Sequence, residues 1–337
     1  MPQILVTGGL GYIGSHTAVE LLAAGFGVVI IDNLSNSSEE VLHRIEKISG
    51  ERPKFYNGDI RDRELLRKIF SENIIDGVIH FAALKSVIES FEQRDEYFSV
   101  NVEGTRALCE VMEESKVSDL VFSSSAAVYG IIEHNPIPEN AECRPTSPYG
   151  ETKVACEKLL EDFAKNNSAW AIVMLRYFNP AGAHESSLIG DSPKYPSSIA
   201  SMIMEVVEKK RELLVINGDD YDTTDGTCVR DYIHVVDLAR AHIFALKFSM
   251  NNKGVHVYNV GTGKGYSVLQ LVDAFSRAAG FEIPAVVGDR REGDIITAVA
   301  DATKINSDLG WHAEKTLDDI AQSSVAWLKK NPHGYGL

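Results

Sequence analysis

The first 180 residues alternate short apolar runs with segments of helical periodicity. A buried strand reads as an apolar run of four to eight residues, whereas an amphipathic helix repeats its apolar positions every three or four. Strands are predicted within residues 3–9, 27–33, 54–60, 76–83, 119–130 and 170–179. Helices are predicted within 13–25, 38–49, 62–73, 96–116 and 149–166. Such alternation predicts an α/β fold, a Rossmann-type doubly wound parallel sheet.

The regular alternation ends near residue 180. Residues 182–232 are rich in turn-forming residues and are predicted to be mostly loop. We therefore expect a dinucleotide-binding domain over residues 1–180 and a smaller C-terminal α/β domain over 181–337, with some segments returning to the N-terminal sheet. A crevice between them, at the carboxyl ends of the strands, is the expected binding site.

A glycine-rich turn, TGGLGYIG, joins the first predicted strand to the first helix. Gly8, Gly11 and Gly14 allow a tight turn and close approach of the backbone to a pyrophosphate at the helix N-terminus. Asp32 ends the second strand, where a carboxylate binds the ribose hydroxyls of NAD and repels a 2′-phosphate. The cofactor predicted from these residues is NAD, although glycines and an acidic cap also occur in ordinary turns.

Two polar clusters follow later strands. Ser123, Ser124 and Ser125 lie at the end of the fifth strand, either as strand-end caps or as hydrogen-bonding groups for a substrate. Tyr149 and Lys153 lie four residues apart at the start of a predicted helix, so they share one face. A cation near a phenol lowers its pKa, which makes this pair a candidate acid–base, although the spacing also arises by chance.

The composition excludes several classes of protein. The formal charge of −15 disfavours a nucleic-acid surface. No apolar run reaches the ~20 residues of a membrane span, and the N-terminus lacks the pattern of a signal peptide. Four dispersed cysteines suggest free thiols in a cytoplasmic protein, and histidine spacing gives no metal site.

Taken in chain order, these segments resemble the extended short-chain dehydrogenase/reductase family, and within it the UDP-galactose 4-epimerases. The resemblance rests on GGLGYIG, DNLSNS, HFAALKSVIES, FSSSAAVYG, SPYGETK, LRYFNPAGAH, DGTCVRDYIHVVDLA and RREGD. It implies an NAD-dependent isomerase that epimerises UDP-hexoses at C4 through a transient 4-keto sugar. It also implies a homodimer formed through two long helices, at residues 100–114 and 151–166.

The resemblance assigns roles to individual residues. Tyr149 becomes the acid–base, Lys153 holds the nicotinamide ribose and lowers the pKa of Tyr149, and Ser125 hydrogen-bonds the sugar 4-hydroxyl. Besides the three glycines, Tyr149 and Lys153, the implied NAD-binding residues are Tyr12, Ile13, Asp32, Asn33, Leu34, Asn36, Ser37, Asp59, Ile60, Phe81, Ala82, Ala83, Lys85, Asn101 and Phe178. Besides Ser125 and Tyr149, the implied substrate-binding residues are Lys85, Asn179, Ser198, Ile199, Val215, Asn217, Arg230, Arg291, Asp294 and Ala298.

Three of these positions depart from the family pattern. Ser198 stands where the family has an asparagine, and Asn217 where it has an aromatic residue, which puts the nucleotide handle in doubt. Ala298 stands where some members carry a tyrosine and others a small residue. A small side chain there enlarges the sugar pocket, so we expect turnover of UDP-N-acetylglucosamine and UDP-N-acetylgalactosamine as well.

Two other functions stay open at this stage. A dehydratase or net dehydrogenase of the same fold would share the cofactor site. Dehydratases of this family, however, carry an Asp-Glu pair where this chain has Ala126 and Ala127. The second alternative is a nonenzymatic nucleotide-sugar sensor. Such a protein would not need Tyr149, Lys153 and Ser125, so the presence of all three residues disfavours it.

Overall fold

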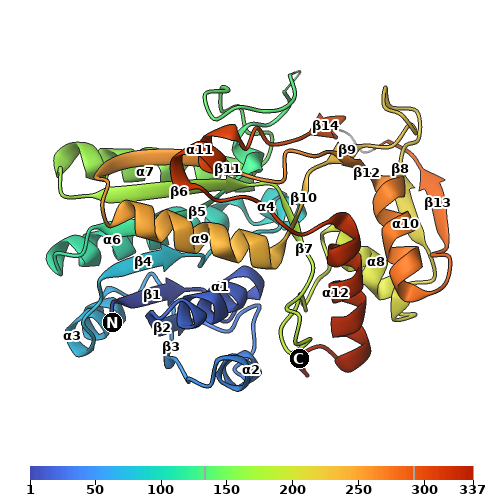
Figure 1. Cartoon of the computed structure of the whole chain (residues 1–337). Helices are drawn as coiled ribbons and strands as arrows, with labels where there is room; N and C mark the ends of the chain where they lie inside the picture. The colour runs from blue at the N-terminus through green and yellow to red at the C-terminus, as the bar shows by residue number, and fades with distance from the viewer. Residues whose placement is uncertain (133, 291–292, 337) are drawn as a thin grey trace.

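The core of the molecule is a seven-stranded, fully parallel sheet (Figure 1). The computed structural model describes residues 1–337 except 133, 291, 292 and 337. The strand order is β11-β6-β5-β4-β1-β2-β3. The strands are β1 (Gln3–Thr7), β2 (Gly27–Asp32), β3 (Lys54–Asn57), β4 (Gly77–His80), β5 (Asp119–Ser125), β6 (Ala171–Tyr177) and β11 (Gly254–Val260). The predicted doubly wound parallel sheet is confirmed.

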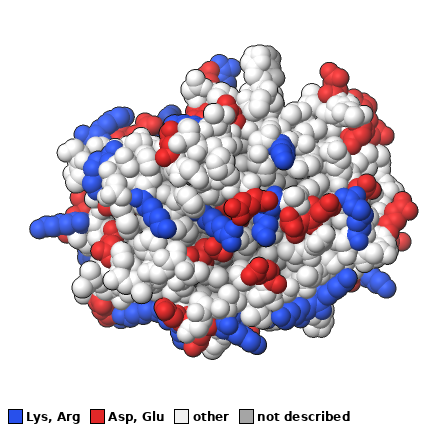
Figure 2. Space-filling view, viewed as in Figure 1, with Lys and Arg blue, Asp and Glu red and all other residues white. Residues whose placement is uncertain are grey.

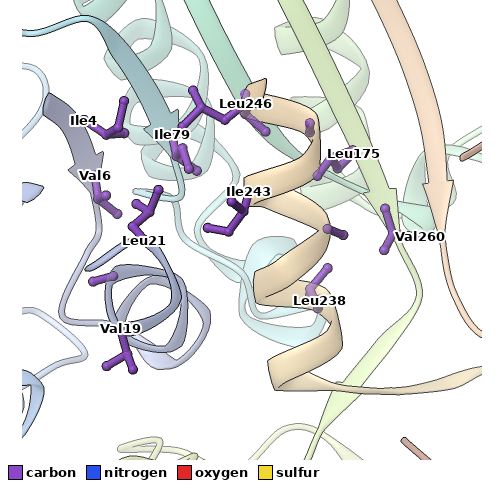
Figure 3. Packing of buried hydrophobic residues seen from close by; sticks show 14 of the residues in the cluster. Ile4, Val6, Val19, Leu21, Ile79, Leu175, Leu238, Ile243, Leu246 and Val260 are labelled. Atoms are coloured by element: carbon purple, nitrogen blue, oxygen red, sulfur yellow. The ribbon is translucent and has the colours of Figure 1, made fainter. Parts of the chain in front are cut away.

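Helices cover both faces of this sheet, because successive strand residues point to opposite sides. On one side Val6, Ile79 and Leu175 pack against α1 (Tyr12–Ala23) and α9 (Val235–Ser249) (Figure 3). The helices α2 (Glu40–Ser49) and α11 (Thr303–Leu309) belong to the same cluster. On the other, Leu5 and Val78 pack against α3 (Arg63–Glu72), α6 (Gly104–Glu114) and α7 (Pro148–Asn166). Burial on both faces explains why the strands read as continuous apolar runs.

The strand order reverses between β1 and β4, which are neighbours in the sheet. Ligands of open parallel sheets bind at such a switch point, outside the carboxyl ends of the strands. The glycine-rich turn follows β1 directly, and Phe81 follows β4. The topology thus brings the strongest sequence motif to the edge where a ligand is expected.

The C-terminal part is built from small sheets packed on helices. The pairs and triples are β7 (Asn179–Ala181) with β10 (Tyr232–His234), β8 (Leu214–Asn217) with β13 (Ala285–Gly288), and β9 (Val229–Arg230) with β12 (Tyr266–Ser267) and β14 (Thr297–Ala298). The helices are α8 (Ile199–Val207), α10 (Val268–Ala279) and α12 (Leu317–Lys330). Figure 1 shows this group beside the large sheet.

One sequence prediction needs refinement and another needs correction. Residues 182–232 are mostly loop, as predicted, but they also contain the nine-residue α8 and the four-residue β8, whose patterns are short and flanked by turn formers. Residues 96–116, predicted as one helix, contain the end of α5 (Arg94–Tyr97), a π-helical stretch at Phe98–Glu103 and α6. The π-helical stretch carries Asn101, whose buried amide bonds Leu84 and Thr152, and such bulges are frequent at functional sites.

Segments beyond residue 181 complete the N-terminal sheet. β11 pairs along its whole length with β6, from Gly254 opposite Ala171 to Val260 opposite Tyr177. α9 packs on the same sheet through Leu238, Ile243 and Leu246 (Figure 3). The sheet is therefore made from both halves of the chain.

The surface carries charges of both signs. On the face in Figure 2, Lys and Arg side chains are interspersed with Asp and Glu. Among the described residues, no helix has the length and apolarity needed to cross a membrane. The described part of the chain also contains no cluster of histidine, cysteine and carboxylate side chains arranged to hold a metal ion.

Candidate active site

The glycine-rich turn forms a cradle in which no side chain fits. Gly8 has φ +66°, and a Cβ there would lie 2.8 Å from the amide nitrogen of Ala82. A Cβ on Gly14 would lie 2.3 Å from the carbonyl oxygen of Gly8. Gly11 caps the N-terminus of α1 without a side-chain partner. The free amide groups of this helix end suit a pyrophosphate, as the sequence predicts.

Asp32 lies beside this cradle at the end of β2. One carboxylate oxygen accepts hydrogen bonds from the Leu34 amide (3.0 Å) and the Ser37 hydroxyl (2.7 Å). The other accepts from the Leu10 amide at 3.0 Å. The carboxylate thus ties the 33–37 loop to the glycine turn and places its charge where an adenosine ribose would lie. These residues fit NAD, because the charge disfavours the 2′-phosphate of NADP.

The other predicted cofactor residues converge on the same edge. The amides of Phe81 and Ala82 donate to Thr7, which joins the β4 end to the β1 end. Asp59 follows β3, and the Arg61 guanidinium holds its carboxyl pKa below the usual value. Tyr12, Leu34, Asn36 and Ser37 line a cleft of roughly 590 Å³. Asp191 lines the same cleft.

Lys85 and Asn101 have different environments. Lys85 is exposed. Burial raises the pKa of the Asp191 carboxyl, and the positive charge of Lys85 opposes this rise. Asn101 is buried, and its amide is engaged by Leu84 and Thr152. Asn101 therefore holds the loop that carries Lys85 against α7.

Tyr149 lies in the first turn of α7. Ser147 caps this helix by accepting a hydrogen bond from the Gly150 amide, and Pro148 occupies the first helical position. Both features favour a helix start here. The phenol is buried beside Ser125, whose hydroxyl also accepts the Ala127 amide at 3.2 Å.

Lys153 lies one turn further along the same face. Its ammonium donates to the Ser123 carbonyl oxygen at 2.7 Å and lies 5.9 Å from the centroid of the Tyr149 ring. Burial lowers the pKa of Lys153 to about 8. The structure thus unites Ser125, Tyr149 and Lys153 at the carboxyl end of β5.

The expected direction of the Tyr149 pKa is wrong for this structure. A neighbouring lysine was expected to lower it, but burial raises the pKa of Tyr149 to about 12, and the Ser125 hydroxyl opposes that rise only in part. The ammonium of Lys153 is directed at a backbone carbonyl rather than at the phenol oxygen. The i, i+4 spacing fixes a shared face, but not the partner that the lysine selects.

The predicted substrate residues come from several small sheets. Arg230 on β9 forms an ion pair with Asp294 at 3.2 Å. Ala298 on β14 is the register partner of Arg230 and packs with Phe178, which follows β6. Asn179 begins β7 and is exposed. Strand pairing therefore joins the predicted phosphate-binding arginine to the predicted sugar pocket.

The nucleotide handle is less enclosed. Ser198 caps α8 and exchanges hydrogen bonds with Ser201, and Ile199 begins that helix. Val215 and Asn217 are exposed on β8. The predicted site residue Arg291 lies outside the described residues.

Sequence reasoning missed three buried groups around this site. Tyr177, at the end of β6, is hydrogen-bonded to Ser123 through their hydroxyls. Glu157 and Arg176 form an ion pair behind Ser124. Glu157 lies one turn after Lys153, and Tyr177 precedes Phe178, so their positions next to predicted residues were the available signal.

Comparison with known proteins identifies the family. Residues 4–261 match the model of the NAD dependent epimerase/dehydratase family. The chain is 50% identical over 334 residues to the UDP-glucose 4-epimerase of Haemophilus influenzae, covering 98% of this chain and 99% of that one.

Solved structures agree with this result. The UDP-glucose 4-epimerase of Bifidobacterium longum, in complex with NAD+ and UDP, superposes with a TM-score of 0.95 at 47% identity, covering 98% of this chain and 99% of that one. The UDP-glucose-4-epimerase of Stenotrophomonas maltophila, with bound NAD and formylated UDP-arabinopyranose, gives 0.97 at 45% identity, with coverage of 98% and 99%.

Proposed function

We propose, for a chain that belongs to the NAD dependent epimerase/dehydratase family, the activity of an NAD-dependent UDP-glucose 4-epimerase. The observation that carries the proposal is the meeting of Ser125, Tyr149 and Lys153 at the carboxyl end of β5. This cluster shares the sheet edge with the Gly8–Gly14 cradle and Asp32. The named relatives and NAD-bound neighbours support the same reaction.

The cradle and Asp32 would hold the dinucleotide. When bound, NAD supplies an acceptor that takes a hydride from the sugar C4 and later returns it to the opposite face. The positive nicotinamide ring would also lower the pKa of a nearby phenol. The chain's own residues must then manage the proton and the position of the sugar.

Tyr149 would take the proton of the sugar 4-hydroxyl as the hydride leaves, and return it in the reverse step. Ser125 would hydrogen-bond that hydroxyl and orient it. Lys153 would bind the nicotinamide ribose. Arg230 would bind the diphosphate, so the 4-keto sugar could turn over while it remains tethered. Positioned acid–base groups of this kind contribute about 10²–10⁴-fold to a rate.

The dehydratase alternative has less support. Loss of water would require an acid after the strand-end serine. Ala126 and Ala127 instead lie in a short 3-10 turn, and Ala126 packs against the buried cluster that contains Phe178 and Ala298. These two positions carry methyl groups where that acid would be needed.

The same proposal includes N-acetylated substrates. Ala298 is buried beside Phe178, directly opposite Arg230 in the sheet register. Its methyl group leaves more room than a tyrosine ring would. We propose that this room admits the 2-N-acetyl group of UDP-N-acetylgalactosamine and UDP-N-acetylglucosamine.

The proposal also includes the division of the chain into domains and its oligomeric state. Residues 1–180 would be mainly NAD-binding and 181–337 mainly nucleotide-sugar-binding. A groove runs between α7 and the segment formed by the π-helical stretch and α6. Apolar Val102, Leu159 and Phe163 line it beside charged Arg106, Lys158 and Asp162, a mixed surface that supports a homodimer of this chain. The four cysteines are free thiols, which suits the reducing cytoplasm. Light scattering of the purified protein would test the dimer, and a monomer mass would refute it.

The first experiment is an epimerisation assay without added NAD, comparing UDP-galactose with UDP-N-acetylgalactosamine. Turnover of both substrates is the expected result. Turnover of UDP-galactose alone would refute the N-acetyl proposal and leave the epimerase intact. Activity on neither, with NAD bound, would refute the substrate assignment and implicate Ser198 and Asn217. Accumulation of NADH with substrate would favour a net dehydrogenase.

A further inference from the structure

A buried ion pair lies behind the proposed catalytic cluster. The Arg176 guanidinium donates to both carboxylate oxygens of Glu157, at 2.9 Å and 2.6 Å. The side chains are only 8% and 7% exposed. A buried ion pair is weak support for stability, because an apolar replacement is often as stable. This pair therefore calls for an explanation in its other contacts.

Glu157 holds the middle of the serine cluster. The Ser124 hydroxyl donates to the Glu157 carboxylate at 2.6 Å. The residue before Ser124 is Ser123, whose carbonyl oxygen accepts a hydrogen bond from the Lys153 ammonium. The residue after Ser124 is Ser125, which faces Tyr149. A bond to the central residue therefore fixes both neighbours.

Glu157 also lies on the helix that carries the acid–base pair. Tyr149, Lys153 and Glu157 are spaced four residues apart on α7 and share one face. The helix thus contacts the end of β5 at Ser123 through Lys153 and at Ser124 through Glu157. Two contacts one helical turn apart set the position of α7 along the strand end.

Arg176 extends the same network to the loop after β5. Its guanidinium donates to the Tyr129 hydroxyl and to the Glu139 carbonyl, both at 3.1 Å. Tyr129 donates in turn to the Asn259 side chain at 2.6 Å. Asn259 donates to the Ile137 carbonyl at 2.8 Å.

Ile137 connects this loop to the proposed sugar pocket. Its amide donates to the Val299 carbonyl at 2.8 Å, next to Ala298. Ile137, Tyr129 and Ala298 belong to one buried cluster with Phe178. The ion pair thereby contacts the strand end on one side and the support of the pocket wall on the other.

We propose that Glu157 and Arg176 are positioning residues for the epimerisation. They hold the Ser123–Ser125 strand end, α7 and the loop residues Tyr129 and Glu139 in one arrangement, so that Ser125, Tyr149 and Lys153 meet at one sugar hydroxyl. The inference rests on the proposed function and adds residues that touch neither substrate nor cofactor.

The charge of Glu157 has a second effect, on Lys153. Burial lowers the pKa of Lys153, and Cys156 and Glu157 oppose this. The other groups around its ammonium are Tyr149, the Ser123 carbonyl, the Phe122 ring, and His80 on β4, whose own pKa is about 3 because of burial and Lys153. Without the negative charge of Glu157, the charged ammonium form of Lys153 is less stable relative to the neutral amine. The pKa of Lys153 then falls, and activity is lost at a lower alkaline pH.

The test compares Glu157→Gln with Glu114→Gln in the NAD-containing protein. Glu114 forms an exposed bidentate pair with Arg67 and serves as the matched control. We measure kcat, KM for UDP-galactose, bound NAD and the pH profile of kcat. For Glu157→Gln we expect kcat to fall by about 10- to 100-fold, with KM nearly unchanged and NAD retained, since small misplacements of catalytic groups cost that much. Its alkaline limb should move to lower pH, whereas Glu114→Gln should match the wild type.

Ser124→Ala is the milder second variant, because it removes one hydrogen bond and leaves the ion pair intact. It should lower kcat several-fold, and Arg176→Lys should lower it more, since lysine cannot bond both carboxylate oxygens. Unchanged kcat in Ser124→Ala and in a folded Glu157→Gln would overturn the inference. A loss confined to KM or to thermal stability would overturn it as well. Absence of wild-type turnover would instead refute the proposed function, so the two failures are distinguishable.

Discussion

The proposed dinucleotide side and the proposed substrate side of this molecule are built in different ways. Gly8 and Phe81 directly follow strands of one parallel sheet, Asp32 ends another strand of it, and Tyr149 lies in the first turn of α7, the α-helix after β5. Arg230, Ala298 and Val215 lie instead on strands of two to four residues in separate small sheets. A continuous sheet brings the proposed cofactor-binding residues to one common edge. Small sheets joined by loops allow the second ligand site to differ through single side chains.

The largest effect should come from filling the cradle on the dinucleotide side. Gly14→Ala places a methyl group 2.3 Å from the Gly8 carbonyl, and backbone cannot yield as a flexible side chain does. We expect protein that purifies without NAD and has no detectable epimerase activity. Absorbance and mass analysis of the released cofactor would check this. The control is Gly50→Ala, because Gly50 has open space around it at a helix end, although its φ of +78° adds some strain. Full NAD content in Gly14→Ala would show that the glycine turn is not the dinucleotide site, and the contrast between the two sides would then be wrong.

Tyr149→Phe tests the point where the two sides meet. Loss of the phenol oxygen removes the proposed acid–base, so kcat should fall by about 10²–10⁴-fold. The cofactor contacts from the sheet edge remain, and NAD content should stay near the wild-type value. Single-turnover kinetics with UDP-galactose would measure the effect. An unchanged kcat would instead favour a protein that binds nucleotide sugars without converting them.

Ala298→Tyr tests the substrate side alone. The ring would fill the space next to Phe178, so turnover of UDP-N-acetylgalactosamine should fall by about 10-fold or more. Turnover of UDP-galactose and NAD content should change little. A ratio of kcat/KM values for the two sugars measures the effect. Equal losses on both sugars would show that the pocket argument is wrong.

The last prediction concerns stability rather than activity, and it is the response of the proposed dinucleotide side to acid. Burial lowers the pKa of His16 on α1 to about 3 and that of His242 on α9 to about 4. Below the usual value near 6.5 the unfolded chain binds protons that the folded chain does not, so stability falls as the pH drops from about 6.5 toward 4. Each histidine should cost about 2 kcal/mol by pH 5.

Urea unfolding at pH 7 and pH 5 would measure this loss. His242→Gln should reduce the difference between the two pH values, because glutamine does not titrate. The control is a matched change at exposed His312. Equal pH dependence in all three proteins would remove buried histidine as the cause.

The contrast between the two sides also explains what the sequence could predict. The β1 strand, the glycine turn, α1 and Asp32 form a local pattern within about thirty residues, so both fold and cofactor follow from it. The pairing of Ala298 with Arg230 joins residues far apart in the chain, and only the resemblance pointed to it. β8 and α8 were hidden because short elements between turn formers carry little periodicity.

Individual side-chain partners were the hardest to predict. The spacing of Tyr149 and Lys153 gave their common face, but not the Ser123 carbonyl that the ammonium selects. Glu157 lies on a helix and Arg176 on a buried strand, and both side chains are buried. Charged residues usually face solvent, so the sequence did not indicate this burial. Their roles depend on which strand end meets which helix, and that information is not local.

The position of β11 and α9 in the sheet has a consequence for biosynthesis. A ribosome that has made the first 180 residues has produced six of the seven strands. That nascent chain still lacks both the helix that covers Ile79 and Leu175 and the strand that pairs with β6. The edge of β6 and one apolar face stay open until α9 and β11 have left the tunnel, and the proposed substrate-binding segments before residue 235 leave it first. The sheet that carries the proposed NAD site is therefore completed only after most of the proposed sugar-nucleotide site has been made.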